Sequence, residues 1–120
     1  MTHPRHPPSE AEAATVVAFW RAAGPARWFA KDAGFDRDFR ERFHDLHFAA
    51  AARRCDAWMA TAEGALALML LLDQYPRNSF RGTGHMYATD PLARMFCRQA
   101  LDTGLDRRVD TDLRLFFYLP

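Results

Sequence analysis

The hydrophobic pattern along the chain is that of a series of helices. Apolar side chains recur every three to four residues in several segments, and no stretch of useful length alternates as a strand does. Ser9 and Glu12 form a capping-box pair at the start of the first segment. Gly24 and Pro25 end it, because glycine favours a left-handed cap and proline cannot continue a helix. We therefore predict a first helix from Ser9 to about Ala23.

A longer amphipathic helix is predicted after a short connection that contains Trp28. Asp36 is its expected N-cap, and the helix extends to about Arg54. Its expected core-facing side chains are Phe39, Phe43, Leu46 and Ala50. Residues 55–60 then form a break in the helical pattern, anchored by Trp58.

The next segment is the most hydrophobic part of the chain. From Thr61 onwards a helix is predicted in which residues 65–72 are apolar on every side, and this is typical of a central helix surrounded by others. Pro76 is predicted to end it. Residues 77–89 are polar and contain glycine, and they form the longest irregular stretch between periodic segments. We expect any functional site to use this loop.

Two more helices complete the pattern. Asp90 and Pro91 have the order of an N-cap followed by proline at the first helical position, and Gly104 suits the end of that helix. A short last helix is predicted from Leu113 to Leu119. Helices joined by brief turns favour an all-α fold of antiparallel helical hairpins, about five helices around the hydrophobic central one.

Length and composition are those of one folded domain. The chain has 120 residues, of which 49% are hydrophobic and 13% aromatic, enough to form a single core. Prolines in the first eight residues favour a flexible N-terminal arm, residues 1–8, before a single helical domain, residues 9–120.

Charge and cysteine usage exclude several classes of protein. The net charge is +1 with acids and bases interleaved, so no strong field exists to attract nucleic acid or an anionic membrane. Cys55 and Cys97 form neither a CxxC pair nor a disulfide ladder, which favours a reducing compartment. The apolar run of residues 65–72 is much shorter than the roughly 20 residues of a membrane span. We expect a cytoplasmic protein that binds neither nucleic acid nor membrane.

Several ordered motifs carry a resemblance to one family. The most specific is LLDQYPRN at residues 71–78 with Arg81-Gly82 downstream, and FFYLP at residues 116–120 follows. From about Val16 to its last residue the chain resembles the bacterial domain-of-unknown-function 924 (DUF924) family. The resemblance implies a tetratricopeptide-like helical fold and no particular activity. Similar members continue past FFYLP into helices with a second motif rich in Arg, His and Asn, so the resemblance covers the N-terminal part of the family's usual length.

A polar cluster directly follows the most hydrophobic helix. Its members are Asp73, Arg77, Asn78 and Arg81, and charged groups buried beside that helix would have to pair. In one interpretation Asp73 accepts hydrogen bonds from an arginine, and the guanidinium groups cap the end of the helix. In the other, one arginine stays free and binds a carboxylate or phosphate together with Asn78. His85, in the same loop, completes the candidate ligand-binding residues.

A metal site is not expected. Glu41 and His44 have the E-x-x-H spacing that di-metal four-helix bundles use, but such a site needs two copies and the chain has one. Neither metal nor cofactor is therefore predicted.

Three functions remain open. The leading hypothesis is a helical-hairpin domain that binds a peptide, a small anionic ligand or a protein partner near the polar cluster. The first alternative is a small hydrolase-like enzyme acting on an anionic substrate, with Asp73 or His85 as base and Arg77 or Arg81 as electrophilic support. The second is a purely structural subunit of an assembly. Pairing of both arginines favours the subunit, an open anion-sized pocket favours ligand binding, and a base in that pocket favours the enzyme.

The C-terminal helix is a candidate interface. Residues 115–119 are continuously apolar, whereas a helix has only one core-facing stripe, so some of these side chains should be exposed. We expect Leu113, Phe116, Phe117 and Leu119 to contribute to contacts with another protein or with a second copy in a homo-oligomer.

Overall fold

All regular structure in the described part of the chain is helical. The computed structural model describes residues 7–120, and within them no strand is formed. The α-helices are α1 (Glu10–Ala23), α2 (Pro25–Trp28), α3 (Ala33–Ala51), α4 (Ala62–Met69), α5 (Tyr75–Ser79), α6 (Asp90–Asp102) and α7 (Leu115–Tyr118). Between them lie the π-helix η2 (Leu70–Gln74) and the 3₁₀ helices η1 (Asp56–Ala60), η3 (Gly84–Tyr87), η4 (Leu105–Arg108) and η5 (Thr111–Leu113). The all-α prediction is confirmed, and the five predicted helices correspond to α1, α3, α4 with α5, α6 and α7. The one-turn helices leave no periodic signal in the sequence.

The expected N-terminal arm is only partly described. Residues 1–6 lie outside the described residues. Pro8, at the end of the predicted arm, accepts a hydrogen bond through its carbonyl from Trp58 Nε1 at 2.9 Å. Trp58 is buried, so the predicted anchor between the second and third helices also holds the chain entering α1. The tetratricopeptide-like stacking of the hairpins stays a prediction.

A central helical segment, residues 62–79, forms the middle of the fold. It comprises α4, η2 and α5 in succession, and Leu70, Gln74 and Tyr75 at the junctions all have right-handed helical backbone angles. The predicted end at Pro76 is therefore wrong. Proline is tolerated because the π-helical turn widens the helix directly before it, with the Tyr75 N–H donating to the Leu70 carbonyl five residues back.

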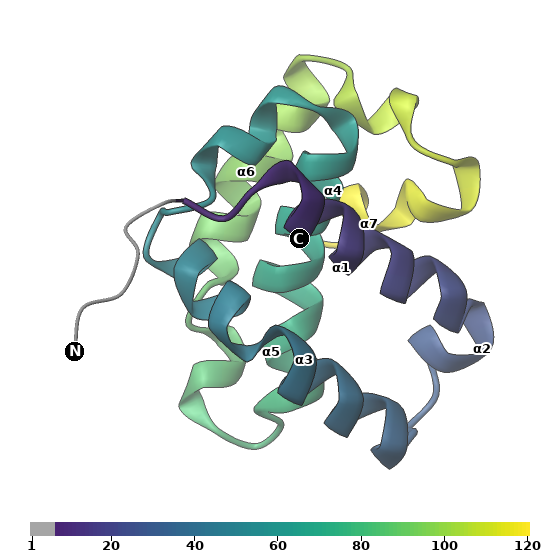
Figure 1. Cartoon of the computed structure of the whole chain (residues 1–120). Helices are drawn as coiled ribbons and strands as arrows, with labels where there is room; N and C mark the ends of the chain where they lie inside the picture. Colours follow the sequence, from purple (N-terminus) through teal and green to yellow (C-terminus); the bar gives the residue numbers. More distant parts are fainter. Residues whose placement is uncertain (1–6) are drawn as a thin grey trace.

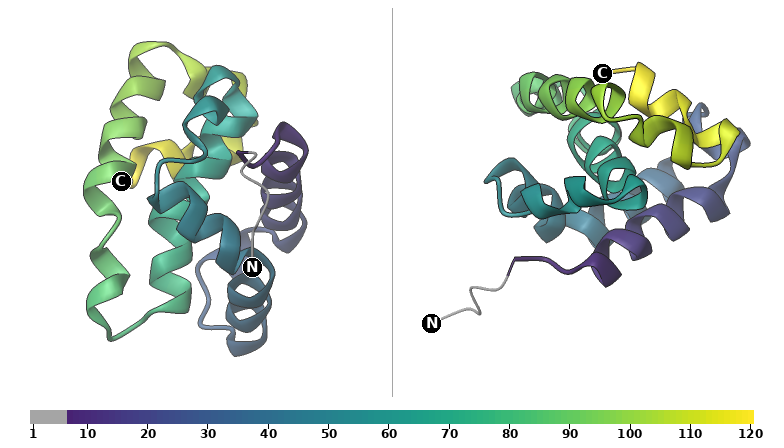
Figure 2. Two further views of the ribbon diagram at one scale, coloured as in Figure 1. Left: turned by 60° about the vertical axis from the view of Figure 1, so that its left-hand side comes forward. Right: turned by 90° about the horizontal axis from the view of Figure 1, so that it is seen from above.

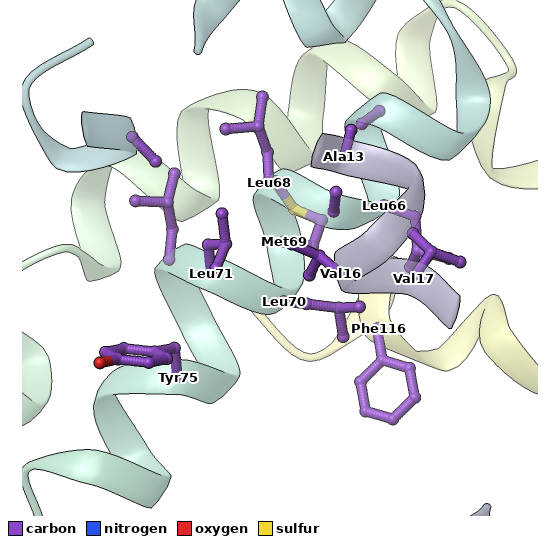
Figure 3. Packing of buried hydrophobic residues seen from close by; sticks show 14 of the residues in the cluster. Ala13, Val16, Val17, Leu66, Leu68, Met69, Leu70, Leu71, Tyr75 and Phe116 are labelled. Atoms are coloured by element: carbon purple, nitrogen blue, oxygen red, sulfur yellow. The ribbon is translucent and has the colours of Figure 1, made fainter. Parts of the chain in front are cut away.

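The other helices surround this segment. α1 lies on one side of it and α6 lies on the other (Figures 1 and 2). Val16 and Val17 of α1 and Leu70 of the central helical segment all belong to the buried core (Figure 3). The prediction of a hydrophobic central helix is confirmed. Within residues 7–120, no helix combines the length and apolar composition needed to cross a bilayer.

Helix α3 begins four residues earlier than predicted. Asp32, not Asp36, is its N-cap, and the Asp32 carboxylate accepts a hydrogen bond from the Phe35 N–H at 3.0 Å. The earlier start places Phe35 on the core-facing stripe, where its ring stacks on Phe39 with centroids 6.0 Å apart. Asp36 lies in the first turn instead, and its carboxylate is available to other partners. Similarly, the residue before α6 is Thr89, so Asp90 is the first residue of α6 and not its cap.

Gly24 has a positive φ of 76°, as its position requires, but its ψ of 168° is extended and not left-handed helical. The reason is that Pro25 starts the one-turn helix α2, which carries Trp28. Trp28 Nε1 donates to the Trp20 carbonyl at 2.7 Å, and the two indoles stack with centroids 5.9 Å apart. The predicted connection is thus a helical turn packed on α1.

The predicted C-terminal interface needs correction. Leu113, Phe116 and Phe117 are buried, so in the folded chain they are core residues and not interface residues. Phe116 is held edge-on against Trp20 and Trp28, at 5.2 Å from each ring. The three share one helical stripe, and the opposite stripe, with Leu115, Tyr118 and Leu119, is exposed.

Two glycines with different surroundings test this packing. At the buried Gly64 of α4, a Cβ atom would collide with the Trp58 carbonyl oxygen. At the exposed Gly34 of α3, a Cβ atom would meet only Asp32 Oδ1 at 3.4 Å, an ordinary contact. We predict that Gly64→Ala lowers the free energy of unfolding by about 1 to 3 kcal/mol, whereas Gly34→Ala raises it by up to about 1 kcal/mol. Urea denaturation of both variants measures this, and stabilisation by both would contradict the tight approach of η1 to α4.

Candidate functional site

Pro76 removes one backbone donor from a turn in which side chains bond two buried carbonyl groups. Proline has no N–H, so residue 76 cannot donate to the Leu72 carbonyl, its α-helical partner, or to the Leu71 carbonyl, its π-helical partner. Side chains replace the missing donor. His47 Nδ1 lies 2.7 Å from the Leu71 oxygen, and Thr89 Oγ1 donates to the Leu72 oxygen at 2.6 Å. Both side chains are buried, so these bonds connect α3 and the start of α6 to the central helical segment.

Arg77 is held on two sides by carboxylates. Its Nη1 donates at 2.7 Å to both the carbonyl and the Oδ1 of Asp73, one turn earlier. The same guanidinium donates to both carboxylate oxygens of Asp90, each at 3.1 Å. Asp73 is only 3% exposed, and burial raises its pKa even though Arg77 acts in the opposite direction. Arg77 is therefore used inside the fold, as the interpretation of internal pairing predicted.

His85 pairs with His47. A carbonyl oxygen only accepts, so His47 Nδ1 carries the proton that bonds the Leu71 oxygen, and His47 Nε2 has a lone pair. His85 Nε2, 2.9 Å from that nitrogen, must then be the donor. Burial lowers the pKa of His47 to about 4, with smaller contributions from the neighbouring His85 and His44. His47 is consequently neutral at pH 7, as this hydrogen-bond arrangement requires.

Asn78 and Arg81 point to a different partner. Asn78 Nδ2 donates to Asp36 Oδ1 at 2.8 Å, while Arg81 Nε lies 3.8 Å from Asp36 Oδ2. The latter distance is too long for a hydrogen bond, and the Arg81 side chain is about half exposed. Arg81 is thus only loosely paired, in contrast to Arg77.

These residues border an open depression of about 410 Å³ between the first turns of α3 and the end of α5. We call it the arginine depression, and it is lined by Ala33, Asp36, Arg37, Arg40, Asn78, Ser79 and Arg81. The side chains of Arg37 and Arg40 are exposed and make no ion pair within residues 7–120. Three guanidinium groups and one carboxylate give the lining a net positive charge.

The candidates from sequence therefore separate into three places. Asp73 and Arg77 pair with each other and with Asp90, Asn78 and Arg81 border the arginine depression, and His85 contacts His47. None of Asp73, Arg77 and His85 lines the depression. In the part of the chain that the structure describes, no group of three or more His, Cys, Asp or Glu side chains could hold a metal ion.

Sequence reasoning missed four participants. The sequence pattern gave no role to Arg37, Arg40, His47 or Thr89. Arg37 and Arg40 are three residues apart and so lie on one helical face, which is a weak signal because charged faces are common. A stronger signal was available for the other two, since a proline inside a buried helix requires side-chain donors for the preceding carbonyls.

Comparisons with known proteins agree with the motifs. The model of a family described as "Bacterial protein of unknown function (DUF924)" matches residues 16–120. A solved structure, a protein of unknown function, ATU0120, from Agrobacterium tumefaciens, is 63% identical and superposes with a TM-score of 0.90. The match covers 92% of this chain and 62% of that chain, so this chain spans less than two thirds of the relative's length. No curated protein matches this chain.

The buried His47 predicts a specific pH dependence of stability. In the folded chain the pKa of His47 is about 4, below the ordinary value of 6.5. Between pH 4 and pH 6.5, His47 therefore binds a proton in the unfolded chain but not in the folded chain. Stability should thus be full above pH 6.5 and fall by up to about 3 kcal/mol as the pH drops through 4. In His47→Asn, the amide can still donate to the Leu71 carbonyl but does not titrate. We predict that the free energy of unfolding, measured by urea denaturation at a series of pH values, falls less steeply with decreasing pH for this variant than for the unchanged chain. Parallel pH curves for the two proteins would contradict the lowered pKa of His47.

Proposed function

Since this chain belongs to the DUF924 family of bacterial proteins, whose function is unknown, we propose a function from its own residues: it is a binding domain for a small anionic ligand held in the arginine depression. The observation that carries the proposal is the convergence of Arg37, Arg40 and Arg81 on one open depression, two of them without an ion-pair partner among residues 7–120.

The chemistry of the lining suits a phosphate or carboxylate. Each guanidinium offers a planar fork of donors that matches such groups, and the Asn78 amide lies beside them. The first turn of α3 adds the partial positive charge of a helix start, since Ala33 is both the first residue of α3 and part of the lining. A volume of about 410 Å³ fits a small molecule better than a folded partner.

Asp36 is the one feature of the depression that opposes an anion. Its carboxylate is bonded to Asn78 and lies 3.8 Å from Arg81, so it occupies part of the positive field. A bound anion would compete with Asp36 for Arg81. This competition gives the proposal a distinctive signature, because removing the charge of Asp36 should strengthen binding while preserving the shape of the depression.

The two alternatives have less support. For a hydrolase, Asp73 is buried in an ion pair with Arg77, and His85 stands outside the depression, so no expected base accompanies the free arginines. For a purely structural subunit, Arg77 is paired internally as expected but Arg81 is not tightly paired. The arginine depression favours ligand binding over both.

Titration calorimetry with inorganic phosphate, pyrophosphate and citrate tests the proposal. We expect at least one of these anions to bind and to raise the melting temperature with concentration. Arg40→Gln and Arg81→Gln should each weaken binding about tenfold, through loss of a charge-assisted hydrogen bond. Asp36→Asn should strengthen it about fivefold, as expected from roughly 1 kcal/mol of removed repulsion.

The control is Arg108→Gln, which removes an exposed arginine of η4 outside the depression and should leave the affinity unchanged. Equal weakening by Arg108→Gln and Arg81→Gln would mean that the anions respond only to net charge. The absence of binding by all three anions, or weaker binding after Asp36→Asn, would refute the proposal.

A further inference from the structure

A second depression lies on another face of the molecule. It is a groove of about 690 Å³ along the outer side of α6 and the C-terminal residues, and we call it the α6 groove. It shares no lining residue with the arginine depression. In Figure 2, α6 and α1 lie on opposite sides of the central helical segment.

Helix α6 has apolar side chains on two faces. The inner face, with Ala93, Phe96 and Ala100, is buried against the core. On the outer face, Met95 is 43% and Leu101 is 42% exposed, and both line the α6 groove. A surface helix ordinarily has a single apolar face, so the outer one has the character of a surface that another element covers.

Aromatic and apolar groups continue across the groove. Tyr118, 53% exposed, and the buried Phe117 also line the groove. The Tyr118 hydroxyl donates to Asp106 at 2.8 Å, which fixes the ring in place. An aromatic side chain that is held by a hydrogen bond therefore forms part of the lining.

The rim of the groove is basic. Arg94 and Arg98 lie one turn apart on α6, and neither makes an ion pair or a hydrogen bond through its side chain within residues 7–120. Asp102 is the one acidic side chain in the lining. Unpaired guanidinium groups beside an apolar floor complement a segment with apolar residues and carboxylates on adjacent faces. The 13 residues of α6 are about 20 Å long, the length of a helix of three to four turns.

The Agrobacterium relative contains additional chain that could supply such a segment. It is 63% identical to this chain with a TM-score of 0.90, so the matched part has the same fold. The match covers only 62% of the relative, and more than a third of its residues therefore have no counterpart here.

From these observations we infer that the α6 groove is the docking site for an amphipathic helix bearing carboxylates, of the kind supplied by the part of the relative outside the match. Apolar side chains of this helix contact Met95, Leu101 and Tyr118, and its carboxylates pair with Arg94 and Arg98. The inference does not depend on the proposed function, since the two sites share no residue.

The test is fragment complementation. The part of the Agrobacterium relative outside the match is produced as a separate peptide and titrated into the full 120-residue chain. We expect binding at one to one, a gain of helical circular dichroism and NMR shift changes confined to α6, α7 and their neighbours. Leu101→Asp, in the lining of the groove, and the charge reversal Arg94→Glu with Arg98→Glu should each weaken binding at least about tenfold.

The matched control is Ala18→Asp, which adds the same charge to an exposed position of α1 and should leave the affinity unchanged. Circular dichroism and melting of each variant alone verify that it is folded. The inference is overturned if the peptide does not bind, if it binds but shifts resonances elsewhere, or if affinity is insensitive to the groove variants. It is also overturned if sedimentation shows this chain to be a dimer that Leu101→Asp dissociates, because the occupant would then be a second copy.

Discussion

Pro76 stands inside a buried helix without an N–H group, and much of the structure depends on how that deficit is met. The carbonyls of Leu71 and Leu72 receive their hydrogen bonds from His47 of α3 and from Thr89 at the start of α6. Buried carbonyls without partners are costly, so each bond favours one placement of its helix beside the central segment. Hydrogen bonds around Pro76 thus fix both α3 and the start of α6 against the central helical segment.

The same arrangement positions the polar groups around α5. Because the helix continues past Pro76, Arg77 and Asn78 project from a regular turn, and Arg77 reaches back to Asp73 and across to Asp90. The end of α5 then lies beside the first turns of α3, where Asn78 contacts Asp36. Arg81 consequently joins arginines from a segment about forty positions earlier in the chain, and the arginine depression forms between them.

The sequence predicts the fold class and the central helix well, because residues 65–72 are apolar on every side and the caps at Ser9 and Gly104 are local signals. It predicts the site less well. Whether Arg77 or Arg81 stays free depends on the position of Asp90 and Asp36, which only the tertiary packing decides. The error at Pro76 has the same origin, since proline ends most helices unless side chains elsewhere supply donors. Phe116 and Phe117 were assigned to an interface because the rings of Trp20 and Trp28 that cover Phe116 lie far away in sequence.

The most direct test of this account is whether the Thr89 hydroxyl replaces the N–H that Pro76 lacks. Thr89→Val removes the hydroxyl with little change of shape and should cost about 1 to 3 kcal/mol, the penalty for a buried carbonyl left unpaired. In the Pro76→Ala background a backbone N–H is again present, and the same substitution should cost less than half as much. Urea denaturation of the two single variants and the double variant gives this coupling. Equal costs in both backgrounds, or no cost in either, would contradict the account.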